Sequence, residues 1–354
     1  MRAPGALAGL FLLTMASARA ESVDIMVLAS DDPGLPWIRH LEETYIPAVN
    51  AALDGTNVEV RWETRLGDGS VDTGDELDAL ANGRAQIAPL PAMTHSWALY
   101  LHNISIATPF VCDRPELVAQ AVDQLHAAFP ALTRAWASFG VHYLGGSFAH
   151  DRLVLASSLP VESVDDLARE RVAADYLFLD WFTGTQMLGL PGDQETFRSG
   201  FESQTTAAAV MTASMADRLA IEDIAPFIVD PGLGSVWGGG LATNRAWFVD
   251  QRAELRNALR IGAKAYGEAM ALEMASLAEV SMDNLVARGA EVSAFSPEES
   301  ARWAQNMHDV AAEWAFEIDI RDMPGRSMLA MWVTELNDTC GPPPRVWQAP
   351  ILGE

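Results

Sequence analysis

Val23-Asp-Ile-Met-Val-Leu-Ala29 is the short apolar run from which the fold can be predicted. Its length and its apolar, partly β-branched residues are typical of a strand. A loop over residues 30–35 follows, and from Trp37 to Leu53 apolar residues recur at the spacing of one helix face. The predicted fold therefore begins with a strand, a loop and an amphipathic helix.

The segments that follow repeat this order. Residues 58–63 alternate between apolar and charged side chains, which is the period of a half-buried strand. Residues 76–82, closed by Gly83, predict a second helix, and Ile87–Leu90 predicts another strand. Because strands alternate with helices, the sequence predicts an α/β fold with a largely parallel sheet.

The second half of the chain continues the alternation. We predict helices over residues 176–188 and 207–219, and a strand or crossover at Trp237-Gly-Gly-Gly-Leu-Ala-Thr243. Beyond Trp247 a helical pattern runs as far as Arg288. A helix of this length is expected to reach from one domain to another.

The chain contains no obvious interdomain linker, which favours two domains between which it crosses more than once. This is the organisation of hinge-closing binding proteins of type II. We predict a first α/β domain from residues 21–149 plus about 237–287, and a second from 150–236 plus about 288–340. A proline-rich tail is expected over residues 341–354.

The composition is strongly acidic and excludes some classes of partner. The 354 residues include 48 Asp and Glu but only 23 Lys and Arg, which gives a formal net charge of −25. This balance disfavours nucleic acid and anionic membrane surfaces as partners. An anionic ligand would have to be held by a local positive site.

The N-terminal residues are typical of a secretory signal peptide. Met1-Arg2 is a short positive region, residues 6–15 are apolar, and Ala18-Arg19-Ala20 is a small-residue cleavage pattern. The apolar part is shorter than the roughly 20 residues that span a bilayer. We therefore predict that residues 1–20 are removed on export and that the mature protein lies in the periplasm.

Motifs of catalytic and metal-binding sites are missing from the sequence. It contains no HExxH, P-loop, Cys-x-x-Cys or GxSxG motif, and its seven histidines lack metal-ligand spacing. The acidic residues of the loop over 68–76 do not match an EF-hand. We therefore predict a protein that is not an enzyme and has no metal or cofactor.

The two cysteines, Cys112 and Cys340, leave two alternatives open. Cys112 lies in the apolar run Pro109-Phe-Val-Cys112, where it could be a buried free thiol. An exported chain could also join it to Cys340 in a disulfide.

Several motifs occur in an order that resembles the DctP-type solute-binding proteins of TRAP transporters. Residues 75–91 resemble the family's helix, glycine and strand that lead into the ligand cleft, and Ala107-Thr-Pro-Phe110 resembles its "lPF" strand. Residues 144–167 resemble the run "LG…fR…P…s.eDL", and Leu241-Ala-Thr-Asn-Arg-Ala-Trp247 resembles the "vsn..w" crossover. The resemblance covers nearly the whole predicted mature chain.

The resemblance implies a periplasmic receptor of two domains that close on a small polar solute, often an organic acid. Such a receptor delivers the solute to the permease subunits of a TRAP transporter. We expect this chain to act as a monomer with these two kinds of partner. The alternative is an exported sensor or scaffold that has kept the fold without binding a transported ligand.

The resemblance also implies two arginines in the ligand site, and only the first is present. Arg152 matches the first, either as a ligand anchor or in structural pairing with Asp151, Asp175 or another acid. At the family's "KGxKiRvP" segment, Arg171 stands for the lysine, Ala173 for the principal arginine and Asp175 for the proline. Since residues two apart in a strand share a face, Arg171 could either reach the space beside Ala173 or point into solvent.

Four further residues complete the predicted ligand site. Two are tryptophans near loops or crossovers, where they could line the cleft or pack in the core. Another is Asp217, in residues 210–218, which faintly resemble the family's "ALqtGvvDGqEN" motif. Together with Asp175 and Arg218, Asp217 could favour a polar or zwitterionic ligand. The four residues are His95, Trp97, Asp217 and Trp237.

Overall fold

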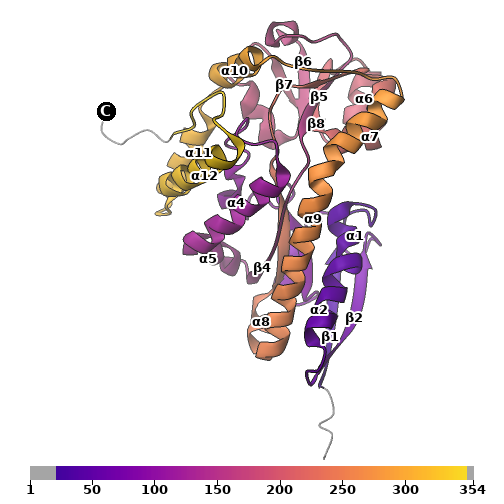
Figure 1. Cartoon of the computed structure of the whole chain (residues 1–354), viewed down its shortest axis with the longest axis vertical. Helices are drawn as coiled ribbons and strands as arrows, with labels where there is room; N and C mark the ends of the chain where they lie inside the picture. Colours follow the sequence, from indigo (N-terminus) through magenta and orange to yellow (C-terminus); the bar gives the residue numbers. More distant parts are fainter. Residues whose placement is uncertain (1–20, 349–354) are drawn as a thin grey trace, which may run out of the picture.

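The computed structural model describes residues 21–348, so the predicted signal peptide and residues 349–354 of the tail lie outside the described residues. Two β-sheets, of five and six strands, form its two halves. Figure 1 shows the long helix α9 (Ala253–Ala287) running beside both of them. The α/β prediction is therefore confirmed.

The first sheet has the strand order β2-β1-β3-β10-β4. Strands β1 and β2 are parallel over nine residues, from the pair Glu21 and Val58 to the pair Ala29 and Leu66. Strand β10 is antiparallel to both β3 and β4. The sheet is therefore mixed, although its N-terminal part is parallel as predicted. Its strands are β1 (Glu21–Ala29), β2 (Val58–Leu66), β3 (Ile87–Pro91), β4 (Val141–Ala149) and β10 (Trp237–Asn244).

Helical segments connect and cover this sheet. The helix predicted over residues 37–53 is present, but a π-helical turn interrupts it. Because α9 packs against α2 and β4, the apolar faces of these elements are buried together. The helical segments of this half are α1 (Pro36–His40), η1 (Leu41–Tyr45), α2 (Ile46–Leu53), α3 (Glu76–Ala81), η2 (Tyr100–Ile104), α4 (Pro115–Ala128), α5 (Pro130–Ser138) and α8 (Arg245–Asp250).

The second sheet has the strand order β11-β9-β5-β8-β6-β7. Its central strand β5 is antiparallel to both neighbours, and all five of its residues are buried. The strands are β5 (Leu153–Ser157), β6 (Arg171–Ala174), β7 (Leu188–Pro191), β8 (Ala208–Thr212), β9 (Phe227–Asp230) and β11 (Glu291–Ala294). Its short helices are η3 (Val164–Leu167), η4 (Tyr176–Phe182), α6 (Phe197–Glu202), α7 (Ala213–Arg218) and η5 (Ile221–Asp223).

Two predicted helices in this half are wrong. Residues 207–219 form strand β8 and then the short helix α7, because Ala208–Thr212 is a wholly buried central strand. Its alanine-rich sequence favours a helix locally, but the strands on both sides supply its hydrogen bonds. Residues 176–188 form only the 3-10 helix η4, and Leu188 already begins the edge strand β7.

The chain passes between the two sheets along neighbouring segments. Residues 150–152 lead from β4 to β5, and residues 231–236 lead from β9 back to β10. The two segments pair through backbone hydrogen bonds, from His150 N to Val236 O at 2.9 Å and from Leu153 N to Gly234 O at 2.9 Å. Helix α9 makes a further passage, because it contacts β4 in one half and α7 and β11 in the other.

The C-terminal helices pack on the first half. Helix α12 (Gly325–Cys340) contacts both α4 and α11 (Val310–Asp319). Helix α10 (Pro297–Asn306), by contrast, contacts η3 of the second half. The predicted second domain therefore contains residues that lie beside the first sheet, because α12 buries its apolar face on α4.

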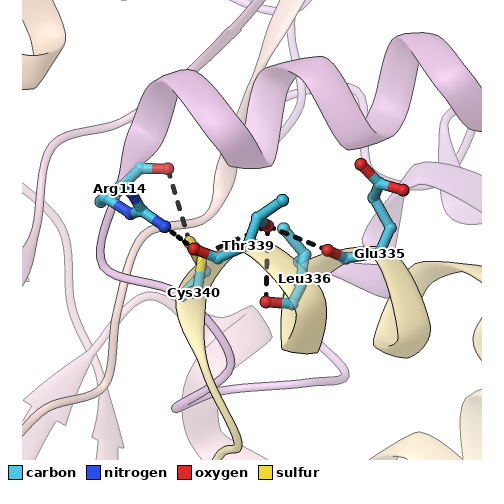
Figure 2. Close-up of a disulfide and its surroundings, with 6 residues drawn as sticks. Arg114, Glu335, Leu336, Thr339 and Cys340 are labelled. Atoms are coloured by element: carbon cyan, nitrogen blue, oxygen red, sulfur yellow. Dashed lines mark hydrogen bonds between the residues drawn. A yellow bond between two sulfur atoms is a disulfide. The ribbon is translucent and has the colours of Figure 1, made fainter.

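A disulfide fixes this arrangement. Cys112 and Cys340 are joined across 228 residues of sequence, so the free-thiol alternative does not hold. Figure 2 shows the bond at the end of α12, where the Arg114 side chain also donates a hydrogen bond to the Thr339 carbonyl oxygen. The end of the last helix is thus tied to the segment before α4. Within residues 21–348, no helix combines the length and apolar character that a membrane span requires.

Candidate ligand-binding site

A cavity of about 700 Å³ lies between the two sheets. This volume falls in the range of roughly 300–1,000 Å³ that is typical of small-molecule sites. Both halves of the molecule contribute to its wall, and the second half contributes more of the lining residues. The lining residues of the first half and the crossing segment are Asp31, Trp37, Thr73, Met93, Thr94 and His150. Those of the second half include Leu153, Asp175, Tyr176, Phe178, residues 191–197, residues 210–212, Ser214, Met215 and Arg218.

Arg218 is the cationic side chain of this wall. The junction between β8 and α7 places it there, since the Thr212 hydroxyl accepts a hydrogen bond from Met215 N at 3.1 Å and caps the helix. The buried carboxylate of Asp151 accepts hydrogen bonds from Ser214 N at 2.8 Å and from Ser214 Oγ at 2.6 Å. These bonds fix α7 to the crossing segment.

The guanidinium group of Arg218 faces the cavity without an ion pair. It donates a hydrogen bond to Gln194 Oε1 at 2.9 Å, and Gln194 also lines the wall. Within residues 21–348, no carboxylate oxygen lies within 4.0 Å of it. Arginine in this state can offer its planar fork to a ligand carboxylate.

Asp31 stands on the wall contributed by the first half. It follows strand β1, and its Oδ2 accepts a hydrogen bond from the indole of Trp37 at 3.1 Å. Burial raises the pKa of its carboxyl group, although the hydrogen bond from Trp37 opposes this change. The buried Glu76 also raises the pKa of Asp31 by charge repulsion, whereas the charge of Arg218 lowers it.

Three more carboxylates line the opposite wall. Asp175 Oδ1 accepts a hydrogen bond from Leu177 N at 2.9 Å and so begins η4. Burial raises the pKa of Asp175, and the charge of Asp193 adds to this effect. Asp193 Oδ1 accepts hydrogen bonds from the backbone of Glu195 and Thr196, both at 3.0 Å. Together with Asp31, the wall carries Asp175, Asp193 and Glu195 against the single Arg218.

His150 does not add a positive charge at neutral pH. Burial, followed by repulsion from Arg218, lowers the pKa of its imidazole to about 4. The ring packs edge-on against Trp37, with 5.5 Å between the ring centroids. His150 therefore acts as a neutral aromatic wall beside Trp37.

Arg152 lies outside the cavity. It binds Asp230 Oδ2 at 3.0 Å and also pairs with Glu279 of α9. Its side chain and that of Asp230 are only 23% and 20% exposed, so this contact is largely shielded from solvent. Of the two predicted roles, the geometry therefore matches structural pairing with an acid, because two carboxylates already occupy the guanidinium group.

Arg171 and Ala173 contribute no cation to the cavity. Arg171 is exposed and donates a hydrogen bond to the Gln204 carbonyl oxygen at 3.3 Å. Ala173 is 4% exposed and packs behind Gly192, which lines the wall. A shared strand face is therefore not enough to bring Arg171 into the site, because it stands at the solvent-facing start of β6.

His95 lies behind the cavity wall. It is fully buried, and its Nδ1 lies 3.1 Å from both the Pro91 carbonyl oxygen and Thr94 Oγ1. Its Nε2 is 3.5 Å from Glu76 Oε2 but makes no hydrogen bond there. His95 therefore supports Thr94 from behind.

The other three predicted residues, Trp237, Trp97 and Asp217, do not line the cavity. Trp237 is buried, donates to Ser147 Oγ at 2.8 Å and stacks on His102, which makes it a core residue. Trp97 is 63% exposed and packs edge-on against Phe139. Asp217 pairs with Arg288 at 2.8 Å and turns away from the wall that its neighbour Arg218 lines.

Of the residues predicted for the ligand site, Asp175 lies on the cavity wall, and so does Arg218, which the sequence suggested together with Asp175 and Asp217 for a polar or zwitterionic ligand. The site residues that the prediction missed include Asp31 and Trp37. An acid directly after a predicted strand, with a tryptophan six residues later, is the signal that could have drawn attention to them. Within residues 21–348, no three His, Cys, Asp or Glu side chains group as ligands for a metal.

No known protein-family profile matches the sequence, and it has no detectable relative among curated proteins. Solved structures do match. A TRAP periplasmic solute-binding protein from Desulfovibrio salexigens superposes with a TM-score of 0.76 at 12% identity, covering 90% of this chain and 97% of the other. The chain has the fold of TRAP periplasmic solute-binding proteins.

Two further TRAP-type structures match over similar lengths. The periplasmic ectoine-binding protein of a Halomonas elongata TRAP transporter has a TM-score of 0.71 at 12% identity and covers 90% of this chain and 100% of its own. A pyroglutamate-specific TRAP solute-binding protein from a marine metagenome has a TM-score of 0.71 at 14% identity, with 91% and 100% covered. These proteins of the same TRAP-type fold are binding proteins.

Proposed function

We propose that this protein is a periplasmic receptor that captures a small polar solute for a TRAP-type permease. The observation that carries the proposal is the cavity of about 700 Å³ between the two halves, walled by polar, aromatic and aliphatic side chains. Side chains from both halves line it, so closure around a solute would exclude water and strengthen every polar contact.

The crossing segments support a hinge at residues 150–152 and 231–236. Both are short, they pair with each other, and the first contributes His150 to the cavity wall. Gly232 and Gly234 have positive φ values of 77° and 89°, so the return segment has backbone conformations that favour glycine. Rotation about these segments would move one sheet relative to the other.

The proposed role requires no catalytic group, and the receptor is inferred to be non-enzymatic. It would receive its solute in the periplasm and pass it to the permease subunits. The similar structures include proteins described with bound glucuronate, pyroglutamate and benzoate, which supports a small organic acid as one class of solute.

Native mass spectrometry of the mature protein, purified without unfolding, tests the proposal. We expect a small molecule to copurify, and a panel of acids and neutral polar solutes to contain at least one that raises the melting temperature in proportion to its concentration. If nothing copurifies and no solute in the panel stabilises the protein, the exported scaffold becomes the better description.

A further inference from the structure

The charges on the cavity wall differ from those expected of a site for a simple anion. Four carboxylates, those of Asp31, Asp175, Asp193 and Glu195, face one guanidinium group, that of Arg218. His150 cannot balance the difference, because its imidazole is neutral at neutral pH. A ligand carrying only negative charge would gain one favourable partner and meet four repulsive ones.

The acids of the wall are not equivalent, because Asp31 follows a strand of the first sheet, whereas Asp175, Asp193 and Glu195 belong to the second half, as Arg218 does. Asp193 is occupied in its own turn, since its carboxylate accepts hydrogen bonds from Glu195 N and Thr196 N. Asp175 is occupied as the cap of η4. Asp31 accepts only the Trp37 indole, and within the described residues no Lys, Arg or His nitrogen lies within 4.0 Å of it.

Asp31 and Arg218 line the same cavity from different halves of the molecule. The guanidinium charge of Arg218 acts on the Asp31 carboxyl group, although the two are too far apart to form an ion pair. One belongs to the first sheet and the other to the second. A solute between them would therefore meet a carboxylate on one side and a guanidinium group on the other.

We propose that the cavity takes a zwitterionic solute, with the carboxylate of the solute on Arg218 and its cationic nitrogen at Asp31 beside the ring of Trp37. Such a ligand satisfies both groups and lowers the negative charge of the wall. Trp37 adds attraction, because a cation near an indole ring is stabilised by the ring's quadrupole. This inference rests on the proposed function and names the class of its solute.

Three solutes of one shape separate the charges. Proline carries a carboxylate and a cationic ring nitrogen, pyroglutamate has a neutral lactam nitrogen, and cyclopentanecarboxylate has no nitrogen. Binding of each is measured by isothermal titration calorimetry at millimolar concentration, and any copurified solute is identified by mass. We expect proline to bind at least tenfold more tightly than the other two, as for a charge-assisted hydrogen bond.

Two variants with matched controls assign the contacts. Asp31→Asn should remove the preference for proline while leaving pyroglutamate binding within about threefold, and Arg218→Gln should weaken all three solutes tenfold or more. Asp283→Asn and Arg134→Gln change the same charges at exposed positions outside the wall, so they should bind as the wild type does.

The outcomes separate this inference from the proposed function. If pyroglutamate or cyclopentanecarboxylate binds as tightly as proline, if the preference survives in Asp31→Asn, or if the copurified solute is an acid without a cationic nitrogen, the zwitterion is excluded and solute capture stands. If no solute binds and none copurifies, solute capture fails and the inference fails with it.

Discussion

Arg152 and Arg218 show how the surroundings of a residue decide its role. Both are arginines in an acidic chain, and Arg152 is the one whose sequence position resembles a ligand anchor. In the structure, Asp230 and Glu279 neutralise Arg152, whereas Arg218 faces the cavity and, among residues 21–348, has only the Gln194 amide as a side-chain partner. A guanidinium group already bound to two carboxylates has little left to offer a ligand.

Replacing Arg152 should therefore affect stability more than solute binding. Arg152→Ala leaves Asp230 largely buried without its partner, and we expect a loss of about 1–3 kcal/mol in the free energy of unfolding. The exposed Glu279 should add little to this. Urea denaturation measures the loss, and Arg134→Ala, at an exposed position, is the control. A tenfold loss of solute affinity with unchanged stability would instead restore Arg152 as the anchor.

His150 should give the protein a measurable dependence on pH. Its pKa is about 4 in the folded protein and 6.5 in an ordinary setting, so below pH 6.5 the unfolded state binds the proton more readily. The contribution of the neutral His150 imidazole to the free energy of unfolding is therefore lost as the pH falls from 6.5 towards 4. We expect roughly 2–3 kcal/mol from this residue over that window.

The comparison of wild type with His150→Asn isolates this effect. Other buried groups, among them His126 and Asp123, titrate in the same range and contribute equally to both proteins. The difference in unfolding free energy between the two proteins should change between pH 7 and pH 4.5. If the unfolding free energies of the two proteins change in parallel with pH over this range, His150 is protonated as easily in the folded protein as in the unfolded chain.

At the scale of elements, the return segment between β9 and β10 is held where only glycine fits. Gly234 has a φ of +89°, and a Cβ atom there would lie 2.5 Å from the Cys112 carbonyl oxygen. That carbonyl oxygen also accepts a hydrogen bond from Ser235 N at 2.8 Å, so the segment cannot easily move away. The close approach fixes where the chain re-enters the first sheet.

We expect Gly234→Ala to destabilise the protein by more than 2 kcal/mol, since it combines an unfavourable φ with a backbone collision. Gly289→Ala is the matched control, because its φ is also positive at +103° but nothing lies within 4 Å of the added carbon. It should cost about 1 kcal/mol. Thermal denaturation of both variants makes the comparison. If the two variants lose the same amount of stability, the φ angle alone accounts for the cost of the substitution.

The disulfide holds the last helix to the segment before α4. Because it closes a loop of 228 residues, its removal should lower the free energy of unfolding by about 2–5 kcal/mol. The double variant Cys112→Ser with Cys340→Ser, measured by urea denaturation, tests this. Reductant should destabilise the wild type to a similar extent and leave the double variant unchanged. A stabilising effect of the double substitution would contradict the expectation.

At the scale of the whole molecule, a hydrogen bond between two side chains joins the two halves beside the cavity. The hydroxyl groups of Ser96, after β3, and Tyr176, in η4, form a hydrogen bond, and Tyr176 also lines the wall. A contact of this kind favours the closed arrangement of the two sheets. It links solute capture to a movement of the entire chain.

Tyr176→Phe removes this hydrogen bond and keeps the ring. We expect the solute-free protein to become more open and the solute affinity to fall by about two- to fivefold, as for a partly exposed hydrogen bond. Small-angle scattering should show a larger radius of gyration without solute and the same radius as the wild type with it. An unchanged radius in both states would show that this contact does not govern closure.

The sequence by itself determined the α/β class, the strands 23–29, 58–63 and 87–90, and the long helix behind Trp247, because periodic apolar patterns are local. It also carried enough ordered motifs to resemble the TRAP-type receptors. It misjudged residues 207–219, since alanine favours a helix until neighbouring strands bury it. The ligand site depended on this segment, because α7 begins only where β8 ends.

Only the tertiary structure decided which charged residues meet. Asp31 and Arg218 are 187 positions apart in the sequence (218 − 31), and they face one cavity because the chain crosses between two sheets. Arg152 sits at that crossing and is withdrawn from the cavity by acids from β9 and α9. Periodicity reports which side of an element is buried, whereas the charge of a cavity depends on side chains that long-range packing brings together.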